Sequence, residues 1–228
     1  MLIAEIYKSI QGEGRRAGRP SVFVRASGCN LRCHFCDTPY TSWSPEGQDL
    51  AVDDVLARVD EWDCEEIVLT GGEPMLFAEL IPLAKELKAR GRQITIETAG
   101  TLYLPVVCDL MSISPKLSNS TPPAERHARW SRRHERTRHR PEIVARLTAE
   151  YDYQLKFVVD EPADCDEVAQ YLGAFDSVDP AKVMLMPQGV DAAELAAKAP
   201  WVAERCEQQG WTYCPRLQIN WFGPVRGT

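Results

Sequence analysis

The sequence predicts an α/β fold whose strands are mostly parallel. Apolar stretches typical of strands recur along the chain and alternate with amphipathic stretches typical of helices. Polar residues repeatedly follow the predicted strands, as Glu73, Glu97, Ser114 and Gln188 do. Barrel-type α/β enzymes carry their functional groups at the carboxyl ends of their strands. We therefore expect a site at that edge of the sheet.

Composition limits the class of protein. A chain of 228 residues that is 44% hydrophobic can bury a substantial core, so we expect a single domain over residues 1–228. No apolar run is long enough to span a bilayer, and the first residues lack the features of a signal peptide, which favours a cytoplasmic protein. The net charge of −7 argues against general binding of nucleic acid.

The elements follow in order along the chain. The periodicity predicts strands over 2–9, 21–26, 93–100, 106–113, 154–159, 182–189 and 211–221, and a buried strand within 66–74 that ends in a glycine turn. It predicts helices over 51–62, 76–90, 141–150, 164–174 and 191–209. Pro141 and Asp191 suit the starts of two of these helices. The first strand leads into a glycine-containing loop, residues 9–14, of the kind that lets a backbone approach a ligand closely.

Three cysteines lie within residues 28–38, at Cys29, Cys33 and Cys36. Their thiolates could hold three irons of a [4Fe–4S] cluster, which normally takes four cysteine ligands, and so leave one iron open. The alternative is a structural zinc loop with Cys64 or His34 as the fourth ligand. Zinc loops usually pair two separated ligand halves, and no second half is found here. The cysteine spacing therefore favours the cluster.

Arg25 lies within an otherwise apolar predicted strand, where an unpaired charge is costly. One interpretation is that the side chain extends to solvent at the strand end. The other is that its guanidinium binds a substrate carboxylate with two hydrogen bonds.

Residues 126–140 carry seven arginines and three histidines against one acid, Glu135. A basic run of this kind can bind nucleic acid or a phosphorylated partner. We favour a solvated helix or a loop paired with the acidic remainder of the chain, and we expect its three histidines to lie at the surface. We treat residues 118–140 as an irregular insertion.

The spacing CxxxCxxC, with the aromatic Phe35 before the last cysteine, resembles that of the radical S-adenosylmethionine (SAM) enzymes. Further motifs along nearly the whole chain resemble one of their families, the 7-carboxy-7-deazaguanine synthases. These motifs are residues 9–14, Cys36-Asp37-Thr38, Thr70-Gly71-Gly72-Glu73-Pro74, Glu97-Thr98-Ala99-Gly100, Ser114-Pro115-Lys116 and Gln154-Leu155-Lys156-Phe157. The resemblance implies a partial TIM-type barrel with a reduced set of helices, and a homodimer.

The resemblance also implies a reaction. The substrate would be 6-carboxy-5,6,7,8-tetrahydropterin, and a 5′-deoxyadenosyl radical from SAM would abstract its C6 hydrogen. Ring contraction with loss of ammonia would give 7-carboxy-7-deazaguanine, in the pathway to queuosine and other 7-deazapurines. The cofactors would be the [4Fe–4S] cluster, SAM and Mg²⁺, and an external flavodoxin- or ferredoxin-like protein would supply the electron. No nucleic acid or membrane partner is implied.

Residue roles follow from the resemblance. Cys29, Cys33 and Cys36 would bind the cluster, and Thr38 would coordinate Mg²⁺. The predicted SAM contacts are Phe35, Gly72, Glu73, Glu97, Ser114, Lys116 and Gln188. The predicted substrate contacts are Ile10, Gln11, Gly12, Glu13, Arg25, Thr70 and Gln218. Gln218 stands at or near a position where many relatives carry a histidine, and residues 211–228 would close over the substrate.

Two other functions compete with this one. A glycyl-radical-enzyme activase shares the cysteine core, but it acts on a protein and would need no tight pterin pocket. The Gln11-Gly12-Glu13 loop, Arg25 and Thr38 argue against it. An iron–sulfur protein that only carries electrons would need neither the open iron nor acidic SAM contacts such as Glu73 and Glu97.

Overall fold

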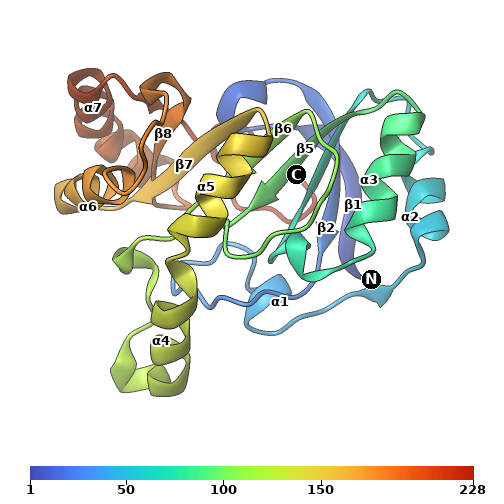
Figure 1. Cartoon of the computed structure of the whole chain (residues 1–228), viewed down its shortest axis with the longest axis horizontal. Helices are drawn as coiled ribbons and strands as arrows, with labels where there is room; N and C mark the ends of the chain where they lie inside the picture. Colours follow the sequence, from blue (N-terminus) through green and yellow to red (C-terminus); the bar gives the residue numbers. More distant parts are fainter.

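Nine strands form one sheet in a computed structural model that describes residues 1–228 (Figure 1). The strands are β1 (Leu2–Ile10), β2 (Pro20–Ala26), β3 (Gln48–Asp49), β4 (Glu66–Gly71), β5 (Gln93–Thr98), β6 (Leu110–Ile113), β7 (Tyr153–Val159), β8 (Val183–Pro187) and β9 (Thr212–Tyr213). The helices are α1 (Pro39–Ser42), α2 (Val52–Val59), α3 (Leu80–Ala89), α4 (Ala124–Arg138), α5 (Pro141–Glu150), α6 (Pro162–Leu172), α7 (Ala192–Gln209) and α8 (Leu217–Phe222). No helix combines the length and apolar character that a bilayer span needs.

The sheet is mostly parallel and open. Its strand order is β3-β1-β2-β4-β5-β6-β7-β8-β9, and every pair from β2 to β9 is parallel, whereas β1 runs antiparallel to both of its neighbours. The connection between β5 and β6 contains no helix. The predicted partial barrel with a reduced helix set is therefore confirmed. The carboxyl ends of β2 and β4 to β8 share one edge, as the polar residues after these strands predict.

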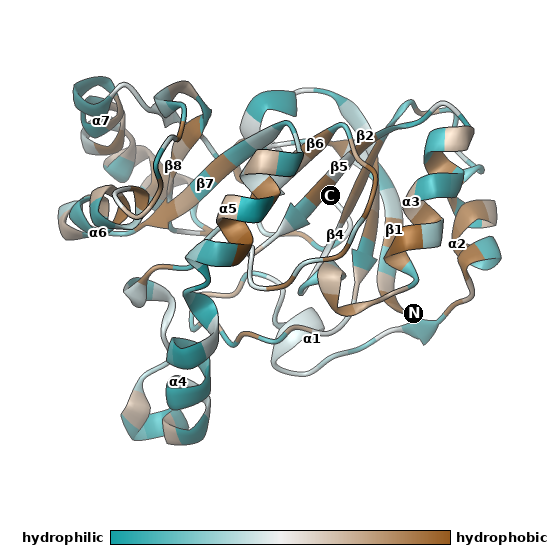
Figure 2. Cartoon of the chain, in the orientation of Figure 1, coloured by the Kyte–Doolittle hydropathy of each residue, from teal (hydrophilic) through white to brown (hydrophobic).

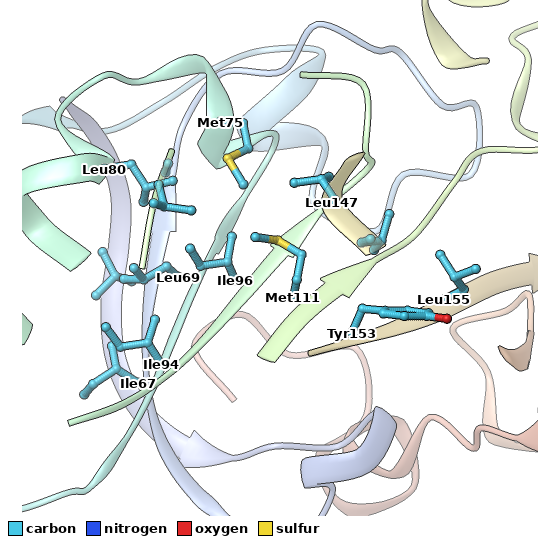
Figure 3. Close-up of a cluster of buried hydrophobic side chains, with 14 of the residues drawn as sticks. Ile67, Leu69, Met75, Leu80, Ile94, Ile96, Met111, Leu147, Tyr153 and Leu155 are labelled. Carbon is cyan, nitrogen blue, oxygen red and sulfur yellow. The ribbon is translucent and has the colours of Figure 1, made fainter. Parts of the chain in front are cut away.

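The main core lies between the sheet and the helices that cover its outer face (Figure 3). Ile67 and Leu69 of β4 pack with Ile94 and Ile96 of β5, and all four side chains are fully buried. Parallel strands that are covered on both faces carry continuous apolar runs. Burial of each such side chain stabilises the fold by about 1.5–3 kcal/mol. This core fixes the strand ends that carry the site.

The predicted last strand, residues 211–221, is wrong beyond Tyr213. β9 pairs with β8 only at Thr212 and Tyr213. Pro215 follows, and its ring nitrogen cannot donate a hydrogen bond to a sheet. The chain then forms α8, although its apolar and aromatic residues are typical of a strand. Strand propensity depends on having a neighbouring strand to pair with, and β9 ends the sheet.

Helix α4 extends away from the rest of the molecule (Figure 1) and is almost entirely hydrophilic (Figure 2). The expected irregular insertion is thus mostly a regular helix, with one non-helical residue at His127. The expectation that its histidines all lie at the surface is wrong for His134, which is the helix's only buried residue.

His134 links α4 to the loop that carries the cysteines. The backbone N–H of Arg32 donates to His134 Nδ1 at 3.1 Å, and His134 Nε2 lies 2.8 Å from the Ser120 hydroxyl. Because Nδ1 accepts, the proton of the neutral ring is on Nε2, which donates to Ser120 Oγ. The Ser120 carbonyl also accepts from the backbone N–H of His34 at 3.0 Å. Burial lowers the pKa of His134 to about 4, so the ring is neutral at pH 7.

We predict that His134→Ala lowers the free energy of unfolding by about 1–3 kcal/mol at pH 7.5, because a buried N–H loses its acceptor. The folded-state pKa lies below the unfolded value of 6.5, so the neutral ring stabilises the fold above pH 6.5 and this contribution is lost as pH falls toward 4. Urea unfolding of both proteins should therefore show a difference that shrinks between pH 6.5 and 4. The control is Arg136→Ala, an exposed change on the same helix, and an equal loss there would refute the link.

Candidate active site

One cavity of about 370 Å³ opens at the carboxyl edge of the sheet. Every predicted site residue except Glu73 lines this cavity. The cysteine loop after β2, the loop after β1 and the C-terminal segment enclose it together with the strand ends. The sequence therefore predicts which side chains line one cavity. It does not by itself decide what each of them binds.

Backbone hydrogen bonds join the cysteine loop to the turn after β4. The N–H of Gly72 donates to Ala26 O at 3.0 Å, and the N–H of Glu73 donates to Gly28 O at 2.9 Å. A Cβ atom at Gly72 would lie 2.3 Å from Gly28 O, so only glycine permits this approach. The double glycine thus fixes the start of the cysteine loop against the sheet edge.

The three loop cysteines are free thiols that line the same cavity. The N–H of Leu31 lies 3.4 Å from Cys29 Sγ, and the Trp43 indole N–H donates to Cys33 O at 2.9 Å. No three His, Cys, Asp or Glu side chains in residues 1–228 are grouped to hold one metal ion. A [4Fe–4S] cluster instead spreads its cysteines over different irons, and hydrogen bonds to their sulfurs tune it. Three thiols that line one cavity supply the number of ligands that a cluster with one open iron takes.

The fourth ligands considered for a zinc loop lie elsewhere. Cys64 is buried, and its thiol is 3.3 Å from Pro20 O, at the amino end of β2. The cysteine loop follows the opposite end of that strand. The imidazole of His34 is exposed. The structure thus does not support a zinc site completed by either residue.

Glu73 faces the protein interior. Its carboxylate is fully buried and accepts from the Met75 N–H at 3.1 Å, the Ala99 N–H at 2.9 Å and the Thr98 hydroxyl at 2.8 Å. Burial raises the pKa of this carboxyl. Glu73 therefore holds the turn after β5, where Ala99 lines the cavity. Its contact with SAM stays a prediction.

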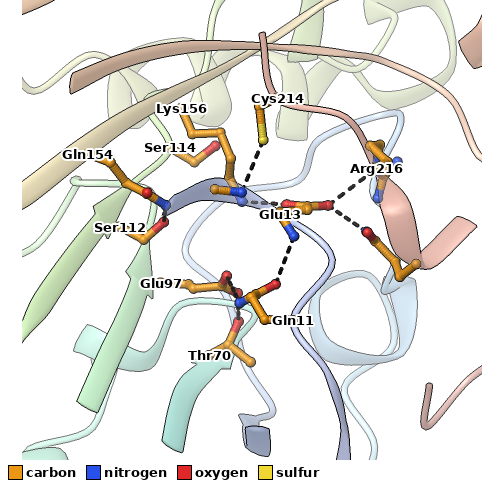
Figure 4. A network of polar contacts seen from close by, with 12 residues as sticks. Gln11, Glu13, Thr70, Glu97, Ser112, Ser114, Gln154, Lys156, Cys214 and Arg216 are labelled. Carbon is orange, nitrogen blue, oxygen red and sulfur yellow. Dashed lines mark hydrogen bonds and ion pairs between the residues drawn. The ribbon is translucent and has the colours of Figure 1, made fainter. Parts of the chain in front are cut away.

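Glu97 joins the residues that were predicted to contact substrate (Figure 4). The Gln11 side-chain amide donates to Glu97 Oε1 at 3.3 Å, and the Thr70 hydroxyl donates to Glu97 Oε2 at 2.8 Å. Gln11 Oε1 in turn accepts from the Glu13 N–H at 3.1 Å. This arrangement places Glu97 on the predicted substrate side of the cavity.

Glu13 is the centre of a second polar network (Figure 4). Its carboxylate pairs with Lys156 of β7, lies 3.3 Å from Arg216 Nε and accepts from the Gln218 amide at 2.6 Å. Burial alone would raise the pKa of Glu13, but the charges of Lys156 and Arg216 lower it to about 2. The carboxylate is therefore ionised at neutral pH and serves as a hydrogen-bond acceptor.

Sequence reasoning missed Lys156, Arg216 and Asp37 as lining residues. Lys156 lies in an apolar strand, so the argument applied to Arg25 would also have indicated it. Arg216 pairs with Asp37 as well as with Glu13. No local pattern marks this pair, since 179 residues separate its members.

Arg25 has partners inside the protein. Its Nε is 2.7 Å from Glu5 Oε1, and its Nη2 donates to the Tyr7 hydroxyl at 2.7 Å. Its side chain is 16% exposed and lines the cavity, so it does not simply extend into solvent. One guanidinium nitrogen, Nη1, has no hydrogen-bond partner among the 228 residues.

The remaining predicted residues lie on two sides of the cavity. Lys116 Nζ donates to the Ser114 carbonyl and hydroxyl oxygens at 2.8 and 2.6 Å, after β6. Thr38 Oγ1 is 3.8 Å from Cys36 Sγ and accepts from the Thr41 hydroxyl at 3.3 Å. The lining also includes Ile10, Gly12, Phe35 and Gln188.

Comparisons with known proteins agree with this geometry. Residues 23–150 match the model of the Radical SAM superfamily. The chain is 43% identical over 229 residues to a 7-carboxy-7-deazaguanine synthase of Rhodopirellula baltica, covering 100% of this chain and 89% of the relative. It is 42% identical to a 7-carboxy-7-deazaguanine synthase of Halobacterium salinarum, covering 95% and 88%.

A solved structure shares the fold. The crystal structure of QueE from Escherichia coli superposes with a TM-score of 0.73, covers 95% of this chain and 93% of its own, and is 23% identical in sequence. This likeness supports the open, mostly parallel sheet. With relatives matched over almost their whole length and three cysteines at the cavity, the chain belongs to the 7-carboxy-7-deazaguanine synthase family of radical SAM enzymes.

Proposed function

We propose that this chain converts 6-carboxy-5,6,7,8-tetrahydropterin to 7-carboxy-7-deazaguanine by ring contraction with loss of ammonia. One observation carries the proposal: the cluster cysteines, the pterin candidates and the SAM candidates other than Glu73 line a single cavity. Family membership supports it. No observation favours a protein substrate or electron transfer alone.

Cys29, Cys33 and Cys36 would hold a [4Fe–4S] cluster at one end of the cavity. With SAM bound, the reduced cluster would supply one electron, and SAM would supply the radical that abstracts a substrate hydrogen. The protein's part is to position SAM and to exclude competing reactions. Of the SAM candidates, Gly72, Ser114, Lys116 and Gln188 follow β4, β6 and β8, and Phe35 belongs to the cysteine loop.

The pterin would bind beside Glu97 and Glu13. Its ring N–H groups are donors, and a carboxylate that lines the cavity is a strong acceptor for them. The Gln218 side chain supports the same placement, because its buried Oε1 has no hydrogen-bond partner and its residue lines the cavity. We assign Glu97 to the pterin rather than to SAM, since it bonds to Gln11 and Thr70.

The substrate carboxylate would lie between Arg25 and a magnesium ion on Thr38. A single hydroxyl ligand fits Mg²⁺, which commonly keeps several waters and takes other ligands from the substrate. An external one-electron donor, a homodimer and a cytoplasmic location complete the proposal.

An anaerobic assay with reconstituted cluster, dithionite, SAM and the carboxytetrahydropterin tests the function. Mass spectrometry should detect a product that lacks one ammonia, while SAM is not consumed stoichiometrically. Cleavage of SAM without conversion of the pterin would reject the synthase and favour an activase for a protein substrate.

We predict that Cys33→Ala abolishes the visible absorbance of the cluster and all cleavage of SAM, because one iron loses its thiolate. Absorbance spectra and detection of 5′-deoxyadenosine check this outcome. Cys108→Ala, at a half-buried cysteine outside the loop, is the matched control. Cleavage of SAM that survives in Cys33→Ala would refute the cluster assignment.

We predict that Arg25→Ala weakens substrate binding by about 1.5–3 kcal/mol, the value of one charged hydrogen-bonded contact. The measurement is the Michaelis constant for the pterin. Glu5→Gln removes the charge that pairs with Arg25 but keeps the arginine, so it should not raise this constant. If both variants raise the Michaelis constant equally, the ion pair between Arg25 and Glu5 supports the site, and Arg25 does not itself bind the substrate.

We predict that Thr38→Ala raises the Mg²⁺ concentration needed for half-maximal activity, because the ion loses its protein ligand. Thr38→Ser keeps the hydroxyl and should retain the dependence of the native chain. An unaltered Mg²⁺ titration in Thr38→Ala would leave Thr38 as a loop residue.

A further inference from the structure

Helix α4 carries an unusual concentration of unpaired positive charge. It has six arginines against two glutamates in a chain with a net charge of −7. Five of these arginines are exposed and form no ion pair with any of the 228 residues. They are Arg126, Arg129, Arg132, Arg133 and Arg136, and we call them the arginine face.

The arginine face is unfavourable for the helix itself. Arg129 and Arg133, like Arg132 and Arg136, are four residues apart and so lie on the same side, where like charges repel. The helix buries only His134 and adds no residue to the main core, and helices of this length are marginal without packing. Its charge therefore has no role in folding that the structure reveals.

The helix is nevertheless held at three points, two on Arg32 of the cysteine loop and one on Trp43, just after α1. His134 accepts from the Arg32 N–H, and the Arg32 guanidinium lies 4.4 Å from the centre of the Trp130 ring. Toward the other end of the helix, His127 packs on Trp43 at 4.8 Å. Trp43 in turn donates to the carbonyl of Cys33. The arginine face is thus fixed beside the loop that would carry the cluster.

We propose that the arginine face is the docking surface for an acidic one-electron donor protein. This inference rests on the proposed function, in which the cluster must be reduced from outside. One electron would pass from the reduced donor to the oxidised cluster, the donor would be oxidised by one electron, and no atom would be transferred.

Charge and size both fit this occupant. Complementary charge speeds encounter and orients the partners, and its effect falls with ionic strength. Electron-transfer complexes are transient and use small interfaces, so one helix face next to the cluster suffices. Arginine is also enriched at protein interfaces, and Trp130 beside Arg129 and Arg133 adds an aromatic group of the kind found there.

The test measures reduction of the cluster rather than synthase turnover. The reconstituted chain, without SAM or pterin, is mixed anaerobically with fully reduced flavodoxin, and bleaching of the cluster is followed by stopped flow. Arg132→Glu/Arg136→Glu should lower the second-order rate constant at least tenfold at low salt, and the difference should disappear at high salt. Photoreduced deazaflavin, a small donor that needs no docking, should reduce both proteins equally fast.

The matched control is Arg58→Glu/Lys85→Glu, which reverses two exposed charges on α2 and α3, across the molecule from α4 (Figure 1). It should retain the native rate with flavodoxin. For the native chain alone, that rate should fall as ionic strength rises.

Two results would overturn the proposal. One is an unaltered flavodoxin rate in the α4 variant, and another is an equal loss with deazaflavin, which would make α4 a support of the loop only. If the first result comes together with arginine-dependent binding of RNA, the face is assigned to nucleic acid. Loss of pterin conversion with normal cluster reduction would instead reject the synthase and leave the docking surface standing.

Discussion

The enclosure of the cavity depends on one carboxylate, that of Glu13, whose side chain is only 13% exposed. It is paired with Lys156 from β7 and Arg216 from the C-terminal segment, so three distant parts of the chain meet at one charge. Removing one member of such a group leaves a charge inside the protein without a partner. The free-energy cost of that unpaired charge exceeds the net stabilisation that the intact pair gives. The first loop, the sheet and the C-terminal segment are therefore fixed relative to one another before any ligand binds.

A second constraint positions the cysteine loop. The turn after β4 approaches Gly28 so closely that Gly72 can carry no side chain, and Glu73 extends the contact to the turn after β5. The acid of the glycine motif thus has a structural role in this chain, whatever it adds to SAM binding. Because a parallel sheet brings these turns to one edge, residues from separate strands meet without a long connection.

The sequence was most informative where local pattern decides the structure. Helix 141–150 and the strand ends at Glu97 and Ser114 depend on periodicity and on Pro141, all of which are visible in the chain. Burial of His134 and the pairing of Arg216 with Asp37 depend on residues more than 100 positions away. Helix α8 was missed for a related reason. Its residues are typical of a strand, but they follow β9 at the edge of the sheet, where no neighbouring strand is left to pair with them.

The cavity and the outer surface beside the cysteine loop differ in how their charges are paired. Inside, the carboxylates of Glu13 and Glu97 line the cavity and offer acceptors for N–H donors, and the cationic partners of Glu13 come from within the protein. Outside, charge that is left unpaired can act on a partner at a distance of up to a Debye length, about 8 Å at physiological ionic strength. If α4 packed its arginines against the acidic remainder of the protein, their charges would be paired and would not attract a partner. Extending α4 away from the sheet, with His134 as its buried anchor, keeps the charge free and its position fixed.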